Sequence, residues 1–512
     1  MDPKVFARLT LLGLTTLSGA CIWVVRTSPR ATRLSEPVTV DSPVKAHLVD
    51  GSVVVFPVGV TYASDSLRGM GSHHDLALRR IADRRTVPLD SVLGVEAIEG
   101  GVDPFTSIAL SSVATAIGVV GSAGLAVAIF GSCPTVYAAS SPEAPMEAEL
   151  FSHSIVPLAE GRDVDRLGLP GTLGRVTLDV RNEALETHFI NHLELLEVAH
   201  EAHEWVTNDA SGLPLALSDW MPTTTIRDRD GLDVSGLLSE RDSAVFATSP
   251  ARLSAARLDD FEDHLTIDVP APQSDSAAVV LRMRNSLLNT VLLYDYMLGR
   301  AGLEAVDWLG GTLERLGTAV ETGRWYQSRM GMRVEVWDGG AFRPAGRIGD
   351  SGPLAWKQVA LVVPVPPNET RLRMRVSFLT DQWRIDRIRV AASIRRPETR
   401  TVPLARILDR DGQDLPEATA AAITPDARYL ETGPGTVVQA VFEPGPATGP
   451  RTFLLASQGY YTEWIRPDWI RAAVPPESFV PSDSVLMLAL ERWRQVKSVM
   501  ENQFYHARIP TR

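Results

Sequence analysis

Hydrophobic and polar residues alternate over many short stretches of the chain, most clearly in its second half. Between Arg371 and Leu379 every second residue is apolar and most of the residues between are arginines. A period of two is that of a strand with one buried and one solvated face. Similar stretches are "RVTLDVRNE", "MRVEVWDGGAF", "KQVALVVPVP", "RIDRIRVAAS" and "TVVQAVFEPG". Many short strands separated by turn signals predict a mainly β chain built from β-sandwiches.

Breaks in this pattern predict the domain organisation. β-Branched runs around Asp50-Gly51 indicate a hairpin and a small N-terminal β domain over residues 40–100. Periodicity of the helical kind occurs over Asn289–Arg300 and Leu303–Thr322, which predicts an inserted helical pair. The expected later units are a β-rich domain at 150–270, a β-sandwich with the inserted helices at 271–400 and a β-rich domain at 401–480.

The last segment, residues 482–505, predicts an amphipathic helix. Ser482 or Ser484 can cap its first turn. The apolar stripe on this helix consists of Leu486, Leu490, Trp493, Val496 and Met500. Because the opposite face is not strongly basic, we expect the stripe to pack on the last sandwich rather than on a lipid surface.

One long apolar run does not fit a soluble β protein. Residues 105–130 contain no charged side chain, and as a helix at ~1.5 Å per residue they would span about 39 Å, enough for a bilayer. Small residues recur at every fourth position and would form one smooth face for close helix contact. They are Ala114, Gly118, Ser122 and Ala126. We expect a membrane helix here; the alternative is a helix buried beneath the β domains.

The N-terminus has the layout of an export signal. Lys4 and Arg8 precede an apolar run that ends in small residues before Cys21. The Gly-Ala-Cys sequence is similar to a bacterial lipobox, in which the cysteine is lipidated after cleavage. Apolar residues continue beyond it, so the 17 residues Leu9–Val25 are the alternative, an uncleaved anchor. Residues 1–25 are thus predicted to be a signal peptide or a membrane anchor.

Two arguments from the sequence place the later domains on opposite sides of the membrane. Four arginines at 79, 80, 84 and 85 precede the apolar run, and the next Lys or Arg after it is Arg162. The positive-inside rule then places everything after Cys133 outside the cytoplasm. A cleaved signal followed by a full second span would return those domains to the cytoplasm instead.

Composition narrows the possible partners and cofactors. The 512 residues carry a net charge of −12, which argues against a nucleic-acid partner. Two cysteines are too few for a disulfide framework, and no Cys/His zinc pattern occurs. The sequence contains no G-x-S-x-G elbow, P-loop or dinucleotide fingerprint. No cofactor and no catalytic residue is therefore predicted.

Three constellations are candidates for binding. His188 and His192 have the i, i+4 spacing of zinc ligands on a helix, but alternation also fits a strand, and we expect no metal. Two "DRDG" stretches, at 228–231 and 409–412, suit either recurring turns or a calcium loop. Aromatic and polar side chains that could contact a glycan or a protein partner are Tyr460, Tyr461, Trp464, Arg466 and Trp469.

Several stretches resemble large, uncharacterised bacterial envelope proteins. These are "RNEALETHFINHLELLEVAH" after the "SCPTVY" of Ser132–Tyr137, "SFLTDQWRIDRIRVA" and "RTFLLASQGYYTEWIRPDWI", and together they cover residues 131–475. The resemblance implies exported β-rich domains outside the cytoplasmic membrane, and lipid anchoring at Cys21. It implies no activity and assigns no functional residue.

These observations favour a membrane-anchored protein of the bacterial cell envelope whose β domains bind a protein or glycan without catalysis. The alternative is an envelope hydrolase acting on carbohydrate through dispersed carboxylates. A cleft with two facing carboxylates would favour the hydrolase, and a flat aromatic face would favour the binding protein.

Overall fold

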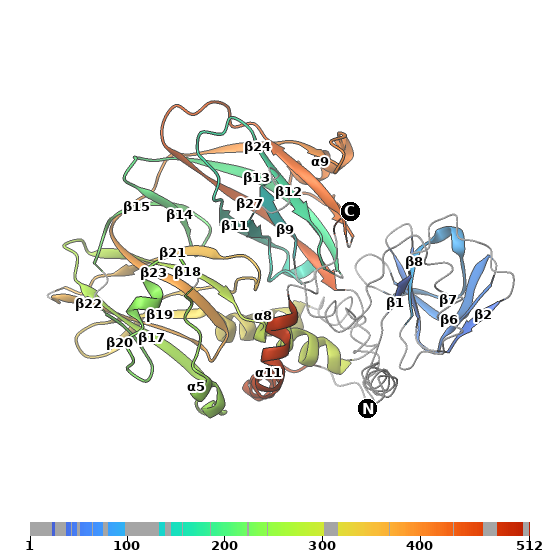
Figure 1. The fold of residues 1–512 in the computed structure, drawn as a ribbon, viewed down its shortest axis with the longest axis horizontal. Coiled ribbons are helices and arrows are strands. Elements are labelled where there is room, and N and C mark those ends of the chain that lie inside the picture. Colours follow the sequence, from blue (N-terminus) through green and yellow to red (C-terminus); the bar gives the residue numbers. More distant parts are fainter. Residues whose placement is uncertain are drawn as a thin grey trace, which may run out of the picture.

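The computed structural model describes seventeen parts of the chain. They are residues 23–25, 37–41, 44–48, 52–63, 65–74, 80–97, 133–138, 145–155, 157–184, 186–222, 225–242, 244–301, 316–367, 369–433, 435–463, 479–504 and 511. Several β-sheets, one of them closed into a barrel, dominate these residues, and helices are few (Figure 1). The prediction of a mainly β chain is confirmed.

The N-terminal sheet has eight strands in the order β1-β8-β3-β4-β6-β5-β2, with β7 paired to β6. Its strands are β1 Trp23–Val25, β2 Val38–Val40, β3 Val44–Leu48, β4 Val53–Phe56, β5 Val60–Tyr62, β6 Ser66–His74, β7 Arg80–Pro88 and β8 Val92–Ala97. Val44, Val54 and Phe56 are in its fully buried core. All pairs in the sheet are antiparallel, and β3 and β4 form the hairpin expected at Asp50-Gly51.

Two histidines of this sheet are buried. His73 and His74 both lie in strand β6. The Nε2 atom of His73 lies 2.8 Å from the hydroxyl of Ser52. The strand continues through them because β4 pairs with this part of β6, so neighbouring strands satisfy the backbone.

The second sheet has nine strands in the order β10-β9-β12-β26-β24-β13-β27-β11, with β25 paired to β13. They are β9 Thr135–Ala138, β10 Met146–Glu149, β11 Gly161–Arg166, β12 Val176–Arg181, β13 Glu186–Ala199, β24 Thr399–Leu408, β25 Leu430–Thr432, β26 Val437–Phe442 and β27 Arg451–Glu463. Strand β24 pairs with β26 at one end and with β13 at the other. The two halves of the sheet share one core, to which Val180, Leu193 and Phe442 belong.

The remaining strands form a barrel and a sheet packed on it. The barrel closes in the order β14-β15-β23-β18-β21, and the sheet has the order β16-β17-β22-β19-β20. These strands are β14 Trp205–Asp209, β15 Pro214–Trp220, β16 Thr225–Asp228, β17 Glu262–Pro270, β18 Ser276–Asn285, β19 Met332–Trp337, β20 Phe342–Ile348, β21 Lys357–Pro364, β22 Arg371–Leu379 and β23 Trp383–Arg395. Leu281, Val390 and Met374 meet in the core between the two.

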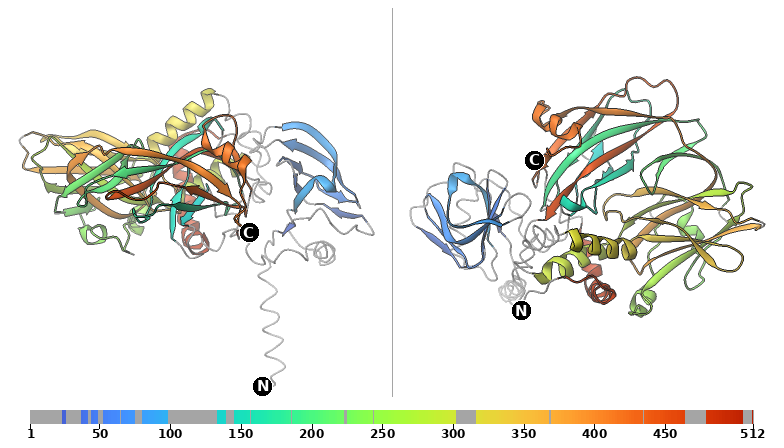
Figure 2. Two further views of the ribbon diagram at one scale, coloured as in Figure 1. Left: turned by 90° about the horizontal axis from the view of Figure 1, so that it is seen from above. Right: turned by 180° about the vertical axis from the view of Figure 1, so that it is seen from behind.

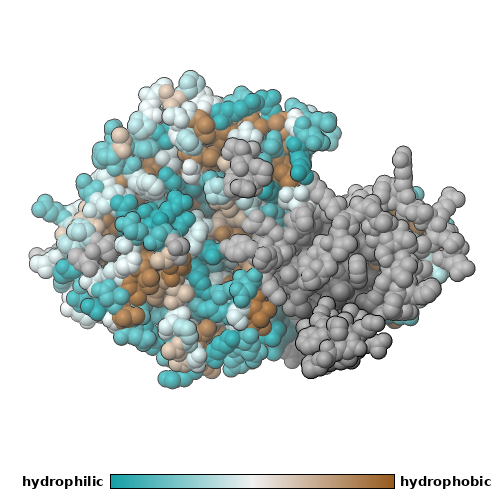
Figure 3. Space-filling model, in the orientation of Figure 1, coloured by the Kyte–Doolittle hydropathy of each residue, from teal (hydrophilic) through white to brown (hydrophobic). Residues whose placement is uncertain are grey.

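The helices lie beside these sheets. They are α4 Ser235–Leu238, α5 Pro250–Ala255, α6 Leu288–Val291, η3 Leu292–Leu298, η4 Gly299–Ala301, α8 Leu316–Met330, α9 Pro416–Ile423 and α11 Asp483–Gln503; short 3-10 turns are η1 Leu89–Ser91 and η2 Pro157–Ala159. Both α8 and α11 lie next to the barrel and the nine-stranded sheet in Figures 1 and 2. Hydrophobic residues on the face in Figure 3 form separate patches among hydrophilic ones.

The C-terminal helix begins as expected but docks elsewhere. Ser482 is its N-cap and accepts a hydrogen bond from the amide of Val485. Its stripe, including Leu490 and Trp493, belongs to the core around α5, α6 and η3. We expected docking on the last sandwich, and that was wrong: apolar side chains of the short helices offer the matching surface.

The predicted membrane segment 105–130, with Ala114, Gly118, Ser122 and Ala126, lies outside the described residues, as does Cys21. No helix within the described parts is both long and apolar enough to cross a membrane.

Candidate functional site

A cavity of about 830 Å³ lies where the nine-stranded sheet, the barrel and the helices meet. Its walls come from the segment 152–164 with β11, from β14 and β21 of the barrel, from α6, η3 and α8, and from residues 347–353. Small-molecule sites in proteins have this size, with mostly apolar walls and a few convergent polar groups. Met283, Leu293 and Met297 provide apolar wall, and two polar groups face it.

The first polar group consists of Asp163 and Lys357, which line the cavity, together with Asp165, which pairs with Lys357 but is not a lining residue. Alternation along β11 places the two carboxylates on one side of the strand. The Lys357 ammonium at the start of β21 pairs with Asp163 and lies 3.3 Å from the Oδ1 atom of Asp165. All three side chains are at most 13% exposed. The other oxygen of Asp165, Oδ2, is buried without a hydrogen-bond partner among the described residues.

Burial and neighbouring charges shift the pKa values of these three side chains in different directions. Burial raises the pKa of Asp165 to about 7 against the lowering effect of Lys357, and the Asp163 carboxylate contributes to the rise. Burial also raises the pKa of Asp163, but Lys357, His153 and the amide of Val164 together outweigh it and hold this pKa below its usual value. The pKa of Lys357 is raised by both carboxylates against the effect of burial. At neutral pH the group therefore holds the Lys357 ammonium and the Asp163 carboxylate, while the pKa of Asp165 is raised into the neutral range.

His153 faces the same part of the cavity. The space it occupies depends on Gly161, since a Cβ atom there would lie 2.6 Å from the Nε2 atom of His153. The surrounding protein lowers the pKa of His153, so the ring is neutral at pH 7. A neutral imidazole both donates and accepts hydrogen bonds, which suits a hydroxyl-bearing ligand.

The second polar group is built around Asp350. The hydroxyl of Tyr326 on α8 donates to its Oδ2 atom at 2.6 Å, and the amide nitrogen of Asn289 donates to its Oδ1 atom at 2.9 Å. Asn285 donates as well. Burial raises the pKa of Asp350 to about 6, although these donors lower it. The Oδ1 atom of Asn289 is buried and accepts no hydrogen bond within the described chain, so an acceptor remains for a ligand.

A network of buried acids lies around the start of the nine-stranded sheet. The Sγ atom of Cys133 donates to the Oε1 atom of Glu149 at 3.0 Å, and its backbone amide donates to Glu186 at 3.0 Å. Glu186 also lies 3.2 Å from the Nε2 atom of His188. Burial raises the pKa of the Cys133 thiol well above its usual value, so the thiol stays protonated and unreactive.

The candidate metal ligands occupy strand β13. His188 is fully buried, and burial lowers its pKa to about 3. The His192 ring is partly exposed and lies 3.5 Å from Glu194. Among the residues that the structure describes, no three His, Cys, Asp or Glu side chains are grouped so as to hold a metal ion.

The aromatic candidates are divided between the core and the cavity. Tyr460 is buried and stacks on Phe189 with ring centroids 4.6 Å apart. Tyr461 lines the cavity and donates from its hydroxyl to the carbonyl of Ser152 at 3.0 Å. Trp464, Arg466 and Trp469 lie outside the described residues.

The two "DRDG" stretches form the same turn. In each, the first Asp accepts backbone hydrogen bonds through Oδ1, from Leu232 to Asp228 and from Gln413 to Asp409. The glycines Gly231 and Gly412 have φ values of +85° and +81°, which other residues adopt only with strain. These carboxylates serve the backbone as Asx turns.

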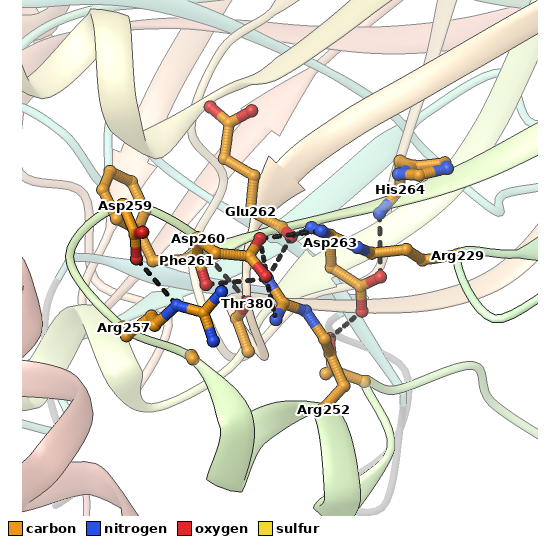
Figure 4. Close-up of polar contacts among 12 residues, drawn as sticks. Arg229, Arg252, Arg257, Asp259, Asp260, Phe261, Glu262, Asp263, His264 and Thr380 are labelled. Atoms are coloured by element: carbon orange, nitrogen blue, oxygen red, sulfur yellow. Dashed lines mark hydrogen bonds and ion pairs between the residues drawn. The ribbon is translucent and has the colours of Figure 1, made fainter.

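A second hollow of about 390 Å³ lies along β17 and β22. In it, Arg333 binds Glu262 through two hydrogen bonds of 2.6 and 2.7 Å, and Arg229 lies 2.7 Å from Asp260. Figure 4 shows the neighbouring Arg252, which also contacts Asp260, at 2.9 Å. Because these guanidinium groups already form ion pairs with carboxylates, the hollow is less suited than the cavity to binding a small molecule.

Sequence reasoning missed the two polar groups of the cavity. One signal was available, since only Lys4, Lys45, Lys357 and Lys497 are lysines among the 50 basic residues. A rare lysine within an alternating strand pattern marks a side chain with a special environment. Its partner Asp163 is 194 positions away, however, and only the fold brings them together.

Comparison with known proteins identifies no family. No protein-family model and no curated protein matches the chain. Solved structures with some likeness include an allantoicase, at 10% identity and TM-score 0.18, covering 47% of this chain and 85% of that one. Another is BuGH86wt in complex with neoagarooctaose, at 6% identity and TM-score 0.16, covering 45% of this chain and 33% of that one. A third is a GH31 alpha-xylosidase from Xanthomonas citri, at 10% identity and TM-score 0.16, covering 85% and 38%. At such TM-scores the likeness supports no statement about fold or activity.

Proposed function

We propose that this chain is an exported, membrane-anchored protein of the bacterial cell envelope that binds a short glycan in the 830 Å³ cavity without catalysis. The observation that carries the proposal is the pairing of apolar walls with an unused hydrogen-bonding atom of a lining residue, Asn289 Oδ1. A sugar presents C–H faces and hydroxyl groups together, so it matches both kinds of surface.

Export and anchoring rest on the N-terminus. The strand β1, Trp23–Val25, pairs with β8, so the last residues of the predicted anchor belong to the N-terminal sheet. Only the 14 residues 9–22 then remain of the apolar run. That length is too short for a span and typical of a signal peptide. Cleavage before Cys21 and lipidation of Cys21 therefore agree better with the sheet than an uncleaved anchor does.

The apolar run at 105–130 completes the proposed anchoring. With a lipid at Cys21, this segment packs against or dips into the outer face of the membrane, and the domains on either side of it remain outside the cytoplasm. This arrangement removes the conflict between the positive-inside rule and a cleaved signal.

A filled cavity tests the binding proposal. Gly323 of α8 lines the cavity, and a Cβ atom there would meet nothing within 4 Å. Gly323→Phe should occupy the cavity without strain and even favour the helix, since glycine is a poor helix former. We expect binding of chitobiose, cellobiose or maltose, measured by isothermal titration calorimetry, to be lost in this variant.

The matched control is Gly236→Phe in α4, which also has open space at its Cβ atom but does not line the cavity. This variant should bind like the unchanged protein. Equal affinity in the Gly323→Phe protein would show that the cavity is not the binding site.

One observation favours the hydrolase as the second candidate. Asp350 and Asp163 both line the cavity, and their environments move their pKa values in opposite directions, as in an acid and base pair. If the protein is a hydrolase, it should release reducing ends from these oligosaccharides, and Asp350→Asn should abolish the release. Binding without release supports the non-enzymatic role.

A further inference from the structure

Arginine and tryptophan side chains gather at one end of the barrel, outside the cavity. Trp220 ends β15, Trp205 begins β14, and Trp356 directly precedes β21. Arg282 lies near the end of β18, and its partner in the register of β23 is Arg387. The parallel register of β14 and β21 places Trp205 level with Trp356, so these side chains come from the same end of the barrel.

The arginines continue rows that begin inside the barrel. Along β18 the row is Ala278, Val280 and Arg282, and the first two belong to the small apolar core of the barrel. Along β23, Arg389 follows Ala391 on the same side, because residues two apart share a face. The apolar core thus ends in a layer of guanidinium groups.

Each tryptophan ring has an arginine over its face. The guanidinium carbon of Arg389 lies 3.5 Å from the ring centre of Trp220, and that of Arg166 lies 4.1 Å from Trp205. Trp356 has Arg282 at 4.8 Å and Arg284 at 4.9 Å. Stacking helps to hold these planar guanidinium groups in place. Arg166, Arg282 and Arg284 also bind protein oxygens, those of Val206, Asp386 and Pro353.

Three arginines near this end make no direct ion pair within the part of the chain that the structure describes. Within the described residues, Arg241, Arg387 and Arg389 make no hydrogen bond or ion pair, whereas Arg282 pairs with Asp386 at 2.8 Å. Arg241 is exposed, and the other two are half-buried. Burial lowers the pKa of Arg387; the nearby carboxylates of Asp386 and Glu240 raise it, and Arg241 lowers it. Positive charge is in excess at this end of an acidic protein.

We propose that this end of the barrel binds a sulfate or phosphate ester group carried by a sugar. Free guanidinium edges match two oxygens of such a group at once. The tryptophan rings provide apolar surface for the sugar. A nucleic acid fits less well, because its charged backbone would extend beyond this small cationic area over an acidic surface.

A disaccharide pair tests this proposal directly. A sulfated heparin disaccharide should bind in calorimetry at least tenfold more tightly than the unsulfated disaccharide of the same backbone. A sugar phosphate is compared with the sulfated disaccharide to distinguish phosphate esters from sulfate esters. Inorganic phosphate, which lacks a sugar, shows how much the sugar contributes to the affinity. The double variant Arg387→Gln with Arg389→Gln should weaken the sulfated disaccharide about a hundredfold, since each charged hydrogen-bonding group is worth about a tenfold change.

Three further variants serve as controls for this result. Arg343→Gln removes an exposed arginine of β20 that pairs with Asp338, and it should bind the sulfated disaccharide unchanged. Arg387→Lys retains the charge but not the planar fork, so it should lose affinity in part even if the double variant fails to fold. Gly323→Phe, which fills the cavity, should leave this binding intact, so the two sites succeed or fail independently.

Three outcomes would overturn the proposal. They are no binding of either ester-bearing sugar at millimolar concentration, an equal loss in Arg343→Gln, and tighter binding of a twelve-nucleotide single-stranded DNA than of the sulfated disaccharide.

Discussion

At the residue scale, Glu149 shows how a buried acid organises its surroundings. One of its oxygens, Oε2, accepts hydrogen bonds from the backbone amides of Leu354 and Ala355 at 2.8 and 3.0 Å. The other accepts the thiol of Cys133. A Cβ atom at position 352 would clash with the carboxyl group, so Gly352 is required there. Glu149 therefore fixes part of the cavity wall, the segment 352–355, to the nine-stranded sheet.

The protonation of Glu149 makes stability depend on pH. Burial raises its pKa from 4.5 to about 7. Between these values the unfolded chain has lost this proton while the folded chain retains it, so the free energy of unfolding falls as pH rises through this window. Glu149→Gln lacks the titration. Its stability relative to the unchanged protein should rise by roughly 3 kcal/mol between pH 4.5 and pH 7.5.

Urea unfolding of both proteins at pH 4.5, 6 and 7.5 measures this difference. Comparison at each pH cancels the other titrating groups, among them His188, whose lowered pKa acts in the opposite direction. A constant difference across the range would show that Glu149 is ionised throughout.

At the element scale, the helix α11 depends on one buried contact. Trp493 is fully buried, and its ring nitrogen donates to the Oδ2 atom of Asp381 at 2.7 Å. Lys497, one turn further along, donates to the same oxygen at 2.8 Å. Asp381 has a φ of +57° in the turn between β22 and β23, and these bonds help to hold that conformation. The contact therefore joins the helix to a strained turn of the sheets.

Trp493→Phe should lower the free energy of unfolding by roughly 2 kcal/mol, because it removes a hydrogen bond to a buried carboxylate and leaves unfilled volume. Chemical denaturation monitored by circular dichroism measures the change. The control is Val499→Ala on the same helix, which is 47% exposed and should cost less than about 0.5 kcal/mol. Equal stability of the Trp493→Phe protein would mean that the other residues of the stripe suffice for docking.

Some of the individual strands and helices could be predicted from the sequence. Strand β22 was predicted from its alternation, and its apolar residues Leu372, Met374, Val376 and Phe378 are all buried. The N-cap Ser482 was also predicted, since capping is a local interaction. The docking partner of α11 was not, because a hydrophobic stripe specifies burial but not the surface that covers it. The second inserted helix, expected over 303–322, is α8 at Leu316–Met330.

At the scale of the whole molecule, long-range pairing decides where the site lies. Strand β13 pairs with β27 along its length, with Glu186 opposite Glu463. The cavity then forms where segments near residues 160, 209, 290, 326 and 350 converge. Strand patterns were local and could be read from the sequence, but these pairings could not, so the cavity and both of its polar groups were beyond sequence reasoning.

Anchoring is also a property of the whole molecule, and it yields the last prediction. If both Cys21 and residues 105–130 attach the chain to the membrane, removing either alone should leave the protein in the membrane fraction after a carbonate wash. One variant replaces residues 1–22 by the cleavable signal of a soluble secreted protein, and another deletes 105–130. Only the combination should release folded β domains, since one lipid or one apolar segment suffices for partial retention. Mass spectrometry of the unchanged protein should find Cys21 as a lipidated first residue. Retention of the combined variant with its fold intact, or an intact Met1, would contradict this form of anchoring, and aggregation on deletion of 105–130 alone would assign that segment to the core instead.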